Sequence, residues 1–239
     1  MSETTRPRQR KITIGRIVAG LIALFVLVEL VMLPFPWTVA RLRTQNPGQT
    51  SLMKERIREA VAKKQRLTIR VSYVPLSRVP ASFVHAVIVG EDGTFYENDG
   101  IDWYEVKESF RTDFDAMKII RGSSTITMQL AKNLWFSTSR DPLTKLNEMI
   151  SAYLLNHYLS KNRIMELYVN YIEFGRGIFG VDAASRIYYG EPASAMTRDQ
   201  AARLAAIIPS PLKHSPNSSS RFVSFRTDII LERMQARGW

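Results

Sequence analysis

The sequence has no cysteine among its 239 residues, which excludes disulfides, thiolate metal sites and a cysteine nucleophile. Its three histidines, at positions 85, 157 and 214, are scattered and lack the spacing of a metal site. The patterns H-E-x-x-H, G-x-S-x-G and the Walker motif are also absent, so the commonest zinc-protease, α/β-hydrolase and P-loop signatures are missing. The remaining composition, 45% hydrophobic and 23% charged, is typical of a folded domain.

One nucleotide-binding pattern is present, but in the wrong context. Residues 175–180 spell G-x-G-x-x-G. A dinucleotide site requires a strand before this pattern and a βαβ unit around it, whereas the preceding residues have helical periodicity. We therefore do not predict a dinucleotide site.

The longest apolar run lies near the N-terminus, over residues 17–33, and is followed by Pro-Phe-Pro-Trp. Its length is at the short end for a membrane span, and the absence of a polar face argues against a buried core helix. A cleaved signal peptide is the competing interpretation, but the run lacks a small-residue cleavage site. We predict a cytoplasmic basic tail over residues 1–16, a transmembrane anchor over residues 17–37 and one domain over residues 38–239.

Charge indicates the orientation of the anchor and the kind of partner. Five basic residues precede the apolar run, against one acid, so the positive-inside rule places the N-terminus in the cytoplasm and the domain outside. The formal net charge is +11, and about +8 of it belongs to the domain. Such a surface suits nucleic acid, an anionic lipid surface or a phosphate-bearing lipid, or serves solubility alone. The anchor favours the lipids, so no nucleic-acid partner is predicted.

Helical periodicity dominates the chain from residue 81 onward, so we expect a mainly α domain without internal repeats. Alternation over residues 67–74 predicts one short strand. The basic stretch over residues 54–66 predicts a helix that lies along lipid headgroups. A solvated helix face is the alternative interpretation of that stretch.

The segment over residues 90–100 joins the end of an apolar helix to a turn, and it begins Gly-Glu-Asp. Such an element can hold a carboxylate at the wall of a cleft, partly desolvated by neighbouring aromatic residues. Desolvation raises a carboxyl pKa toward the range of a general base. A solvated acidic turn is the alternative.

The segment over residues 121–133 is more specific. A glycine and two serines precede a helix whose first turn would expose free N–H groups, which predicts an anion site. Gln129, Lys132 and Asn133 share one face of that helix. A capped amphipathic helix is the alternative. Farther on, Lys145 and Glu148 are one turn apart, as are Arg163 and Glu166, and each pair also suits an ordinary helical salt bridge.

Together these segments resemble the peptidoglycan glycosyltransferases, over residues 50–239. The first family motif, E-D-x-x-F-x-x-H-x-G, matches residues 91–100, and the second, G-x-S-T-x-x-Q-Q-x-x-K-N, matches residues 122–133. The third, R-K-x-x-E, matches residues 144–148, the fourth, K-x-x-I-L-E-x-Y-L-N, residues 161–170, and the fifth, R-x-x-x-[IV]-L, residues 226–231. Five motifs in order are highly specific. No Ser-x-x-Lys follows, so the chain resembles the monofunctional form.

The resemblance implies a lysozyme-like glycosyltransferase domain that polymerises lipid II into β-1,4-linked glycan strands and releases undecaprenyl pyrophosphate. Glu91 is then the base that deprotonates the acceptor hydroxyl in an inverting displacement. Lys132 and Lys145 hold the pyrophosphate, and the supporting residues are Ser124, Thr125, Gln129 and Asn133. Glu148 is the second catalytic glutamate and positions the leaving group directly or through Mg²⁺ or Mn²⁺. We read Glu166 as structural.

The same resemblance predicts the location and the partners. The protein is expected in the bacterial inner membrane, with its catalytic domain on the periplasmic side. Expected partners are lipid II, the growing glycan strand and membrane lipids, with cell-division or penicillin-binding proteins as candidates.

Three departures from the family motifs change the chemistry of the side chain. Asn98 replaces a histidine, Met128 a glutamine and Thr144 an arginine. We expect Asn98 and Met128 to lose hydrogen bonds around the site and Thr144 to lose a cation, for which Arg140 is a candidate substitute. These departures leave two alternatives to an active synthase: a weakly active or inactive paralogue that acts as a membrane scaffold, and a lysozyme-like lytic enzyme. The retained lysines speak against the lytic enzyme, because a pyrophosphate leaving group needs cations and a sugar leaving group needs an acid.

Overall fold

The computed structural model describes residues 15–21, 24, 33–108, 124–136, 138 and 142–239. Its helices from the N-terminus are α2 (Pro36–Arg41), α3 (Ser51–Ala62), α4 (Ala81–Glu91), α6 (Ile126–Trp135), α7 (Pro142–Tyr158), α8 (Lys161–Tyr171), α9 (Val181–Tyr189), α10 (Arg198–Ala206) and α11 (Arg221–Ala236), with 3₁₀ turns η1 (Leu76–Arg78) and η2 (Ala193–Ala195). Residues 103–108 are also helical. The prediction of a mainly α domain is confirmed, and α9 is a helix that we did not predict.

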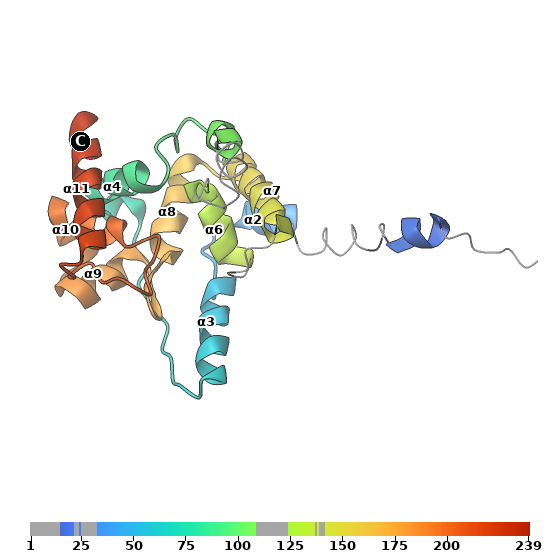
Figure 1. The fold of residues 1–239 in the computed structure, drawn as a ribbon, viewed down its shortest axis with the longest axis horizontal. Coiled ribbons are helices and arrows are strands. Elements are labelled where there is room, and N and C mark those ends of the chain that lie inside the picture. The colour runs from blue at the N-terminus through green and yellow to red at the C-terminus, as the bar shows by residue number, and fades with distance from the viewer. Residues whose placement is uncertain (1–14, 22–23, 25–32, 109–123, 137, 139–141) are drawn as a thin grey trace, which may run out of the picture.

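The helices form two groups that meet along α8 (Figure 1). In one group α4 packs against α10 and α11, and in the other α6 packs between α7 and α8. Buried aromatic side chains, such as Phe83, Phe95 and Tyr168, lie in the core. Serine or threonine begins five of these helices by accepting a hydrogen bond from the first turn, namely α3, α6, α8, α10 and α11. These caps explain why the helices start where they do.

The structure also contains a small sheet with strand order β1-β3-β2. Its strands are β1 (Arg70–Val71), β2 (Glu173–Gly175) and β3 (Ile178–Phe179), and β1 is parallel to β3 while β2 is antiparallel to it. The predicted strand over residues 67–74 is therefore wrong in extent. The Asn170 side chain occupies both the N–H and the C=O of Val74, at 2.8 Å each, so the chain leaves the ladder there.

The G-x-G-x-x-G pattern forms the β2–β3 hairpin. Gly180 has φ +83°, and a Cβ at this position would lie 2.5 Å from the Asn170 carbonyl oxygen. Glycine is thus required here by the close approach of two backbones. The pattern therefore has a structural cause, and it begins at the end of strand β2, not after the helical stretch that we expected.

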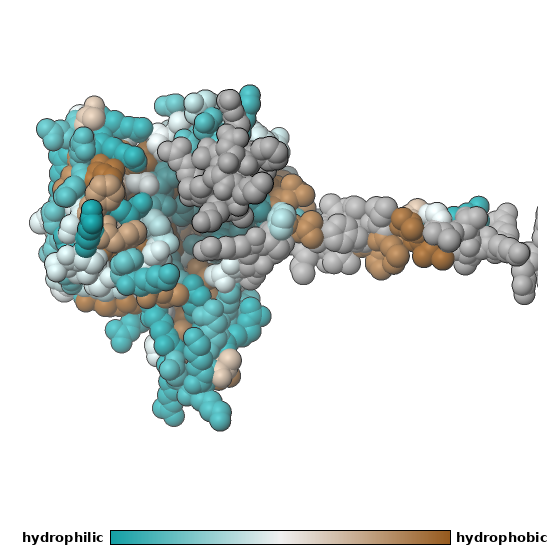
Figure 2. All heavy atoms as spheres, viewed as in Figure 1, coloured by the Kyte–Doolittle hydropathy of each residue, from teal (hydrophilic) through white to brown (hydrophobic). Residues whose placement is uncertain are grey.

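Helix α3 and the chain after it project from the domain as an arm, which we define as residues 51–70 (Figure 1). Hydrophilic side chains cover the arm (Figure 2). Its basic side chains are exposed except Arg56, which is only 11% exposed and pairs with the buried Glu173 at 2.8 Å. The expectation that the whole basic stretch faces lipid is therefore wrong for Arg56, because this side chain ties the arm to the domain.

The structure describes only part of the predicted anchor over residues 17–37. Residues 15–21 and 24 are helical, and α2 begins with Pro36 at its first position, with Phe35 and Trp37 stacked at 4.5 Å. Residues 22–23 and 25–32 of the anchor and residues 1–14 of the basic tail lie outside the described residues. Among the helical segments that are described, none has both the length and the hydropathy needed to cross a bilayer.

Candidate active site

Glu91 is the last residue of α4, and its carboxylate lies between α6 and α11. Its side chain is only 8% exposed. Gln129 Nε2 donates to Oε2 at 2.9 Å and Arg226 Nη2 donates to Oε1 at 3.1 Å. Burial raises the pKa of Glu91 to about 7, Asp92 adds to this rise, and the contacts with Gln129 and Arg226 only partly oppose it. The predicted base thus has a pKa suited to accepting a proton near neutral pH.

Both donors to Glu91 are themselves held by the protein. The buried Tyr168 hydroxyl donates to Gln129 Oε1 at 2.9 Å, and Arg226 Nε donates to the Ala206 carbonyl oxygen at 3.0 Å. The carboxylate therefore has fixed neighbours contributed by three helices, α6, α8 and α11.

The start of α6 differs from our prediction of a free anion site. The Ile126 N–H donates to Asp92 Oδ2 at 3.0 Å, and the Met128 N–H donates to the Thr125 hydroxyl at 3.1 Å. Asp92 and Thr125 thus accept from two N–H groups of this first turn, which leaves neither of the two for a ligand. The Thr125 hydroxyl also donates to the Gly100 carbonyl oxygen at 2.7 Å, so it is engaged in structural contacts.

A second charged cluster lies where α6 faces α7. Lys145 Nζ donates to the Ser124 hydroxyl and lies 3.2 Å from Glu148 Oε2. The Glu148 side chain is 6% exposed, whereas that of Lys145 is 40% exposed. Lys132 makes no ion pair with any residue in the part of the chain that the structure describes. Lys132 lines a cleft and has no acidic partner among these residues, so its charge is available to an anionic ligand.

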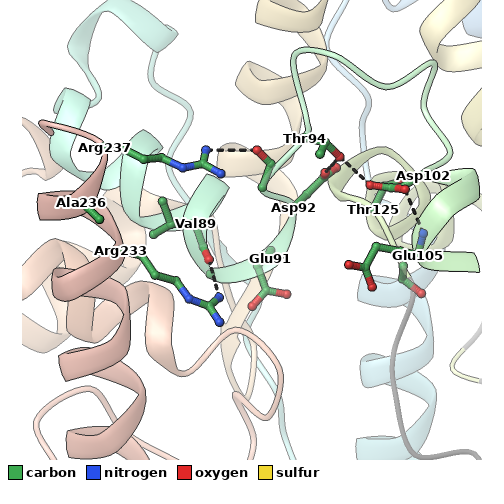
Figure 3. Close-up of a pocket in the computed structure, with 13 residues that line it drawn as sticks. Val89, Glu91, Asp92, Thr94, Asp102, Glu105, Thr125, Arg233, Ala236 and Arg237 are labelled. Atoms are coloured by element: carbon green, nitrogen blue, oxygen red, sulfur yellow. Dashed lines mark hydrogen bonds between the residues drawn. The ribbon is translucent and has the colours of Figure 1, made fainter. Parts of the chain in front are cut away.

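Two cavities meet at Glu91. One, of about 480 Å³, is lined by Glu91, Ser124, Gln129, Lys132, Asn133 and Arg226, among others. The other, of about 610 Å³, shares Gly90, Glu91 and Ser124 with the first and extends toward the end of α11. There Arg233 and Arg237 lie across from Asp102 and Glu105, with Glu91 between them (Figure 3). One carboxylate thus faces two spaces, as a transfer between two substrates requires.

The structure brings most of the predicted residues together. Five of them line the smaller cavity, namely Glu91, Ser124, Gln129, Lys132 and Asn133, and Thr125 lines the larger one. Lys145 and Glu148 line neither cavity but adjoin them through Ser124. Sequence reasoning did not predict roles for Arg226 and Tyr168, although both belong to quoted motifs, and it missed Arg233 and Arg237, for which no motif gave a signal.

Two of the three departures are explained by their surroundings. Asn98 makes the hydrogen bonds that we expected it to lose, since it donates to Asp92 at 3.0 Å and accepts from Gly100 N–H at 2.9 Å and Lys161 at 3.1 Å. Met128 is fully buried, where an apolar side chain fits. Thr144 lies on α7 one residue before Lys145. Arg140 and residues 121–123 lie outside the described residues.

Comparison with known proteins gives a consistent result. A family model described as Transglycosylase matches residues 57–235. A biosynthetic peptidoglycan transglycosylase of Bordetella avium (strain 197N) is 38% identical over 226 residues, which cover 92% of each chain. Another, from Janthinobacterium sp. (strain Marseille), is 35% identical over 227 residues, which cover 95% of this chain and 96% of the relative. The chain therefore belongs to the biosynthetic peptidoglycan transglycosylases and is a peptidoglycan glycosyltransferase.

Proposed function

We propose that the protein polymerises lipid II into β-1,4-linked glycan strands by inverting displacement, with Glu91 as the general base. The observation that carries this proposal is the buried Glu91 carboxylate at the junction of two cavities, one of which is lined by Lys132, a cation that has no ion-pair partner among the described residues. The larger cavity takes the acceptor and the smaller one takes the donor. We assign the donor to the smaller cavity because Lys132 lines it and the donor carries the anionic pyrophosphate that leaves.

The proposed transfer needs only Glu91 as the proton acceptor and the two substrates. Glu91 removes the proton from the acceptor sugar hydroxyl, and the oxygen attacks the anomeric carbon of the donor. The bond from that carbon to the pyrophosphate oxygen breaks, and the pyrophosphate departs with the electron pair. Lys132 and Lys145 stabilise the charge that develops on the leaving group, supported by Ser124 and Asn133.

A divalent cation, Mg²⁺ or Mn²⁺, belongs to the proposal as a companion of the pyrophosphate. No group of three or more acidic or histidine side chains suited to a metal ion occurs among the described residues. Mg²⁺ in phosphate sites needs only one or two protein carboxylates, because phosphate oxygens and water supply the rest. The buried Glu148 fits that requirement, and the ion would neutralise charge on the leaving group.

The location in the cell envelope follows from the family. We extend it to an anchor over residues 17–37 in the inner membrane, with the domain on the periplasmic side. The apolar run and the basic residues before it support this orientation. The anchor would keep the cleft near its membrane-bound precursor and near the membrane lipids.

The test is polymer formation from labelled lipid II by the full-length protein and by Glu91→Gln. We expect the substitution to lower the rate by about 10²- to 10⁴-fold, the usual contribution of a general base, with little change in precursor binding. Glu148→Gln should also lower the rate, with a steeper dependence on divalent metal. Wild-type activity in a folded Glu91→Gln protein would overturn the proposal.

A further inference from the structure

The Gln129 side chain is held at both ends of its amide. Its Nε2 donates to Glu91 at 2.9 Å, and its Oε1 accepts from the Tyr168 hydroxyl at 2.9 Å. Tyr168 comes from α8 and is fully buried. Burial, with the nearby charges of Glu91 and Asp92, raises the pKa of Tyr168 well above its usual value, so the hydroxyl keeps its proton and can donate it in this contact.

The orientation of this amide decides which form of Glu91 is favoured. With the NH₂ group toward the carboxylate, the hydrogen bond stabilises the charged base. If the amide turned over, its oxygen would face Glu91 and could accept only from a protonated carboxyl group. The reversed amide would therefore favour the acid, which cannot remove a proton from the acceptor.

We propose that Tyr168 is a positioning residue for the transfer reaction, because its hydroxyl orients Gln129 so that Glu91 is held as a proton acceptor. Tyr168 lines neither cavity and acts only through Gln129. The inference rests on the proposed role of Glu91. It also gives Gln129 a role at the base in place of the pyrophosphate contact that we predicted from its sequence motif.

The other charged groups around Glu91 are independent of Tyr168. Arg226 reaches the opposite carboxylate oxygen from α11, and Asp92 is the next residue in the chain. The remaining charged residues that line the two cavities are Arg56, Asp102, Glu105, Lys132, Glu173, Arg233 and Arg237. Replacing the Tyr168 hydroxyl removes none of these charges. A change in the pH dependence of Tyr168→Phe would therefore come from the amide.

The experiment measures kcat/KM for lipid II polymerisation by full-length wild type and Tyr168→Phe, from about pH 5 to about pH 9. We expect the acidic limb of the profile to move up by roughly one pH unit, which lowers the rate about tenfold at low pH. The rate should return close to that of wild type at high pH, where Glu91 is ionised in either amide orientation. KM should change little, because Tyr168 touches no substrate.

Tyr171→Phe is the matched control. Tyr171 lies on the same helix, and its hydroxyl donates to the Pro47 carbonyl oxygen at 2.6 Å, away from Glu91. This variant loses a tyrosine hydroxyl without touching Gln129, so its acidic limb should stay in place. An equal loss of rate at every pH in Tyr168→Phe, or the same shift in both variants, would show a merely structural role and overturn the proposal.

Gln129→Met gives a second test, which also serves if Tyr168→Phe does not fold. Removing the amide should move the acidic limb at least as far as Tyr168→Phe does, and the double variant should match Gln129→Met because Tyr168 acts on Glu91 only through Gln129. An unmoved limb in Gln129→Met overturns the positioning role, whereas an active Glu91→Gln overturns the proposed base itself. The two failures are therefore distinguishable.

Discussion

Glu91 and Glu166 each lie beside an arginine, yet their carboxylates differ in the direction of their pKa shift. Glu166 accepts from the Leu76 N–H at 2.8 Å, the Tyr73 hydroxyl at 2.6 Å and Arg163. Burial alone would raise the pKa of Glu166, but these donors outweigh it, and the pKa falls below its usual value. Among the described residues two side chains donate to Glu91, so burial prevails and its pKa rises to about 7.

The comparison shows how a structural carboxylate differs from a reactive one. Donors surround Glu166, which keeps it charged and ties α8 to Tyr73 and to the first residue of η1, Leu76. Glu91 is buried with fewer donors than its charge requires, and this deficit makes it able to accept a proton. The cost falls on stability, because the folded protein holds an incompletely compensated charge.

The largest expected effect concerns stability as a function of pH. The pKa of Glu91 is about 7 in the folded protein against an ordinary 4.5, so the folded state binds this proton more tightly. The stabilisation that the bound proton on Glu91 gives to the folded state is therefore full below pH 4.5 and is lost as the pH rises through about 7. Relative to wild type, Glu91→Gln should gain about 3 kcal/mol of unfolding free energy between these limits.

The measurement is denaturant unfolding of wild type and Glu91→Gln at acidic and at mildly alkaline pH. Taking the difference between the two proteins cancels the titration of other groups, such as Asp92 and Glu173, whose pKa values burial also raises. A constant difference across this pH range would mean that Glu91 titrates normally, and the contrast with Glu166 would disappear.

A smaller effect of the opposite sign is expected at Glu166. Glu166→Gln weakens its charge-assisted hydrogen bonds, so the unfolding free energy at neutral pH should fall by about 2 kcal/mol. Because the pKa of Glu166 is lowered in the folded state, the stability advantage of wild type over Glu166→Gln should shrink as the pH falls below the ordinary pKa of a glutamate.

An exposed glutamate serves for comparison. Glu59, which is 44% exposed, is a partner of Arg56, and Glu59→Gln should change the unfolding free energy by less than about 0.5 kcal/mol.

Polymerisation separates the two glutamates further. Glu166→Gln should retain the specific activity of wild type once the folded fraction is taken into account. A selective loss of activity with unchanged stability would show that Glu166 acts in catalysis and that our structural assignment is wrong.

Apolar spacing is a local signal and predicted the mainly α character of the domain, although it did not reveal α9. The sequence predicted the strand over residues 67–74 poorly, since the side chain of Asn170, a residue distant in the sequence, replaces the ladder there. Motif spacing located Glu91 and Lys132. It could not show that Asp92 would occupy the start of α6, because that contact joins two motifs that are separate in the sequence.

The same contrast between compensated and uncompensated charge applies to the arm, where the effect on stability should be smallest. Arg56 is paired with Glu173, whereas the Lys63 and Lys64 side chains at the end of α3 are exposed. Replacing both lysines by glutamine should leave the unfolding free energy unchanged. Binding of the protein without residues 1–37 to anionic vesicles should weaken by about 2 kcal/mol, about 1 kcal/mol for each lysine, and its salt dependence should flatten.

The control for the arm keeps the charge and changes the side chain. Lys63→Arg with Lys64→Arg should bind anionic vesicles like the parent protein, because the attraction depends on charge rather than on the ammonium group. Vesicles of neutral lipid should bind all three proteins equally weakly. If the glutamine variant binds anionic vesicles as tightly as its parent at every salt concentration, the exposed lysines form only a solvated helix end, and the role in lipid docking is wrong.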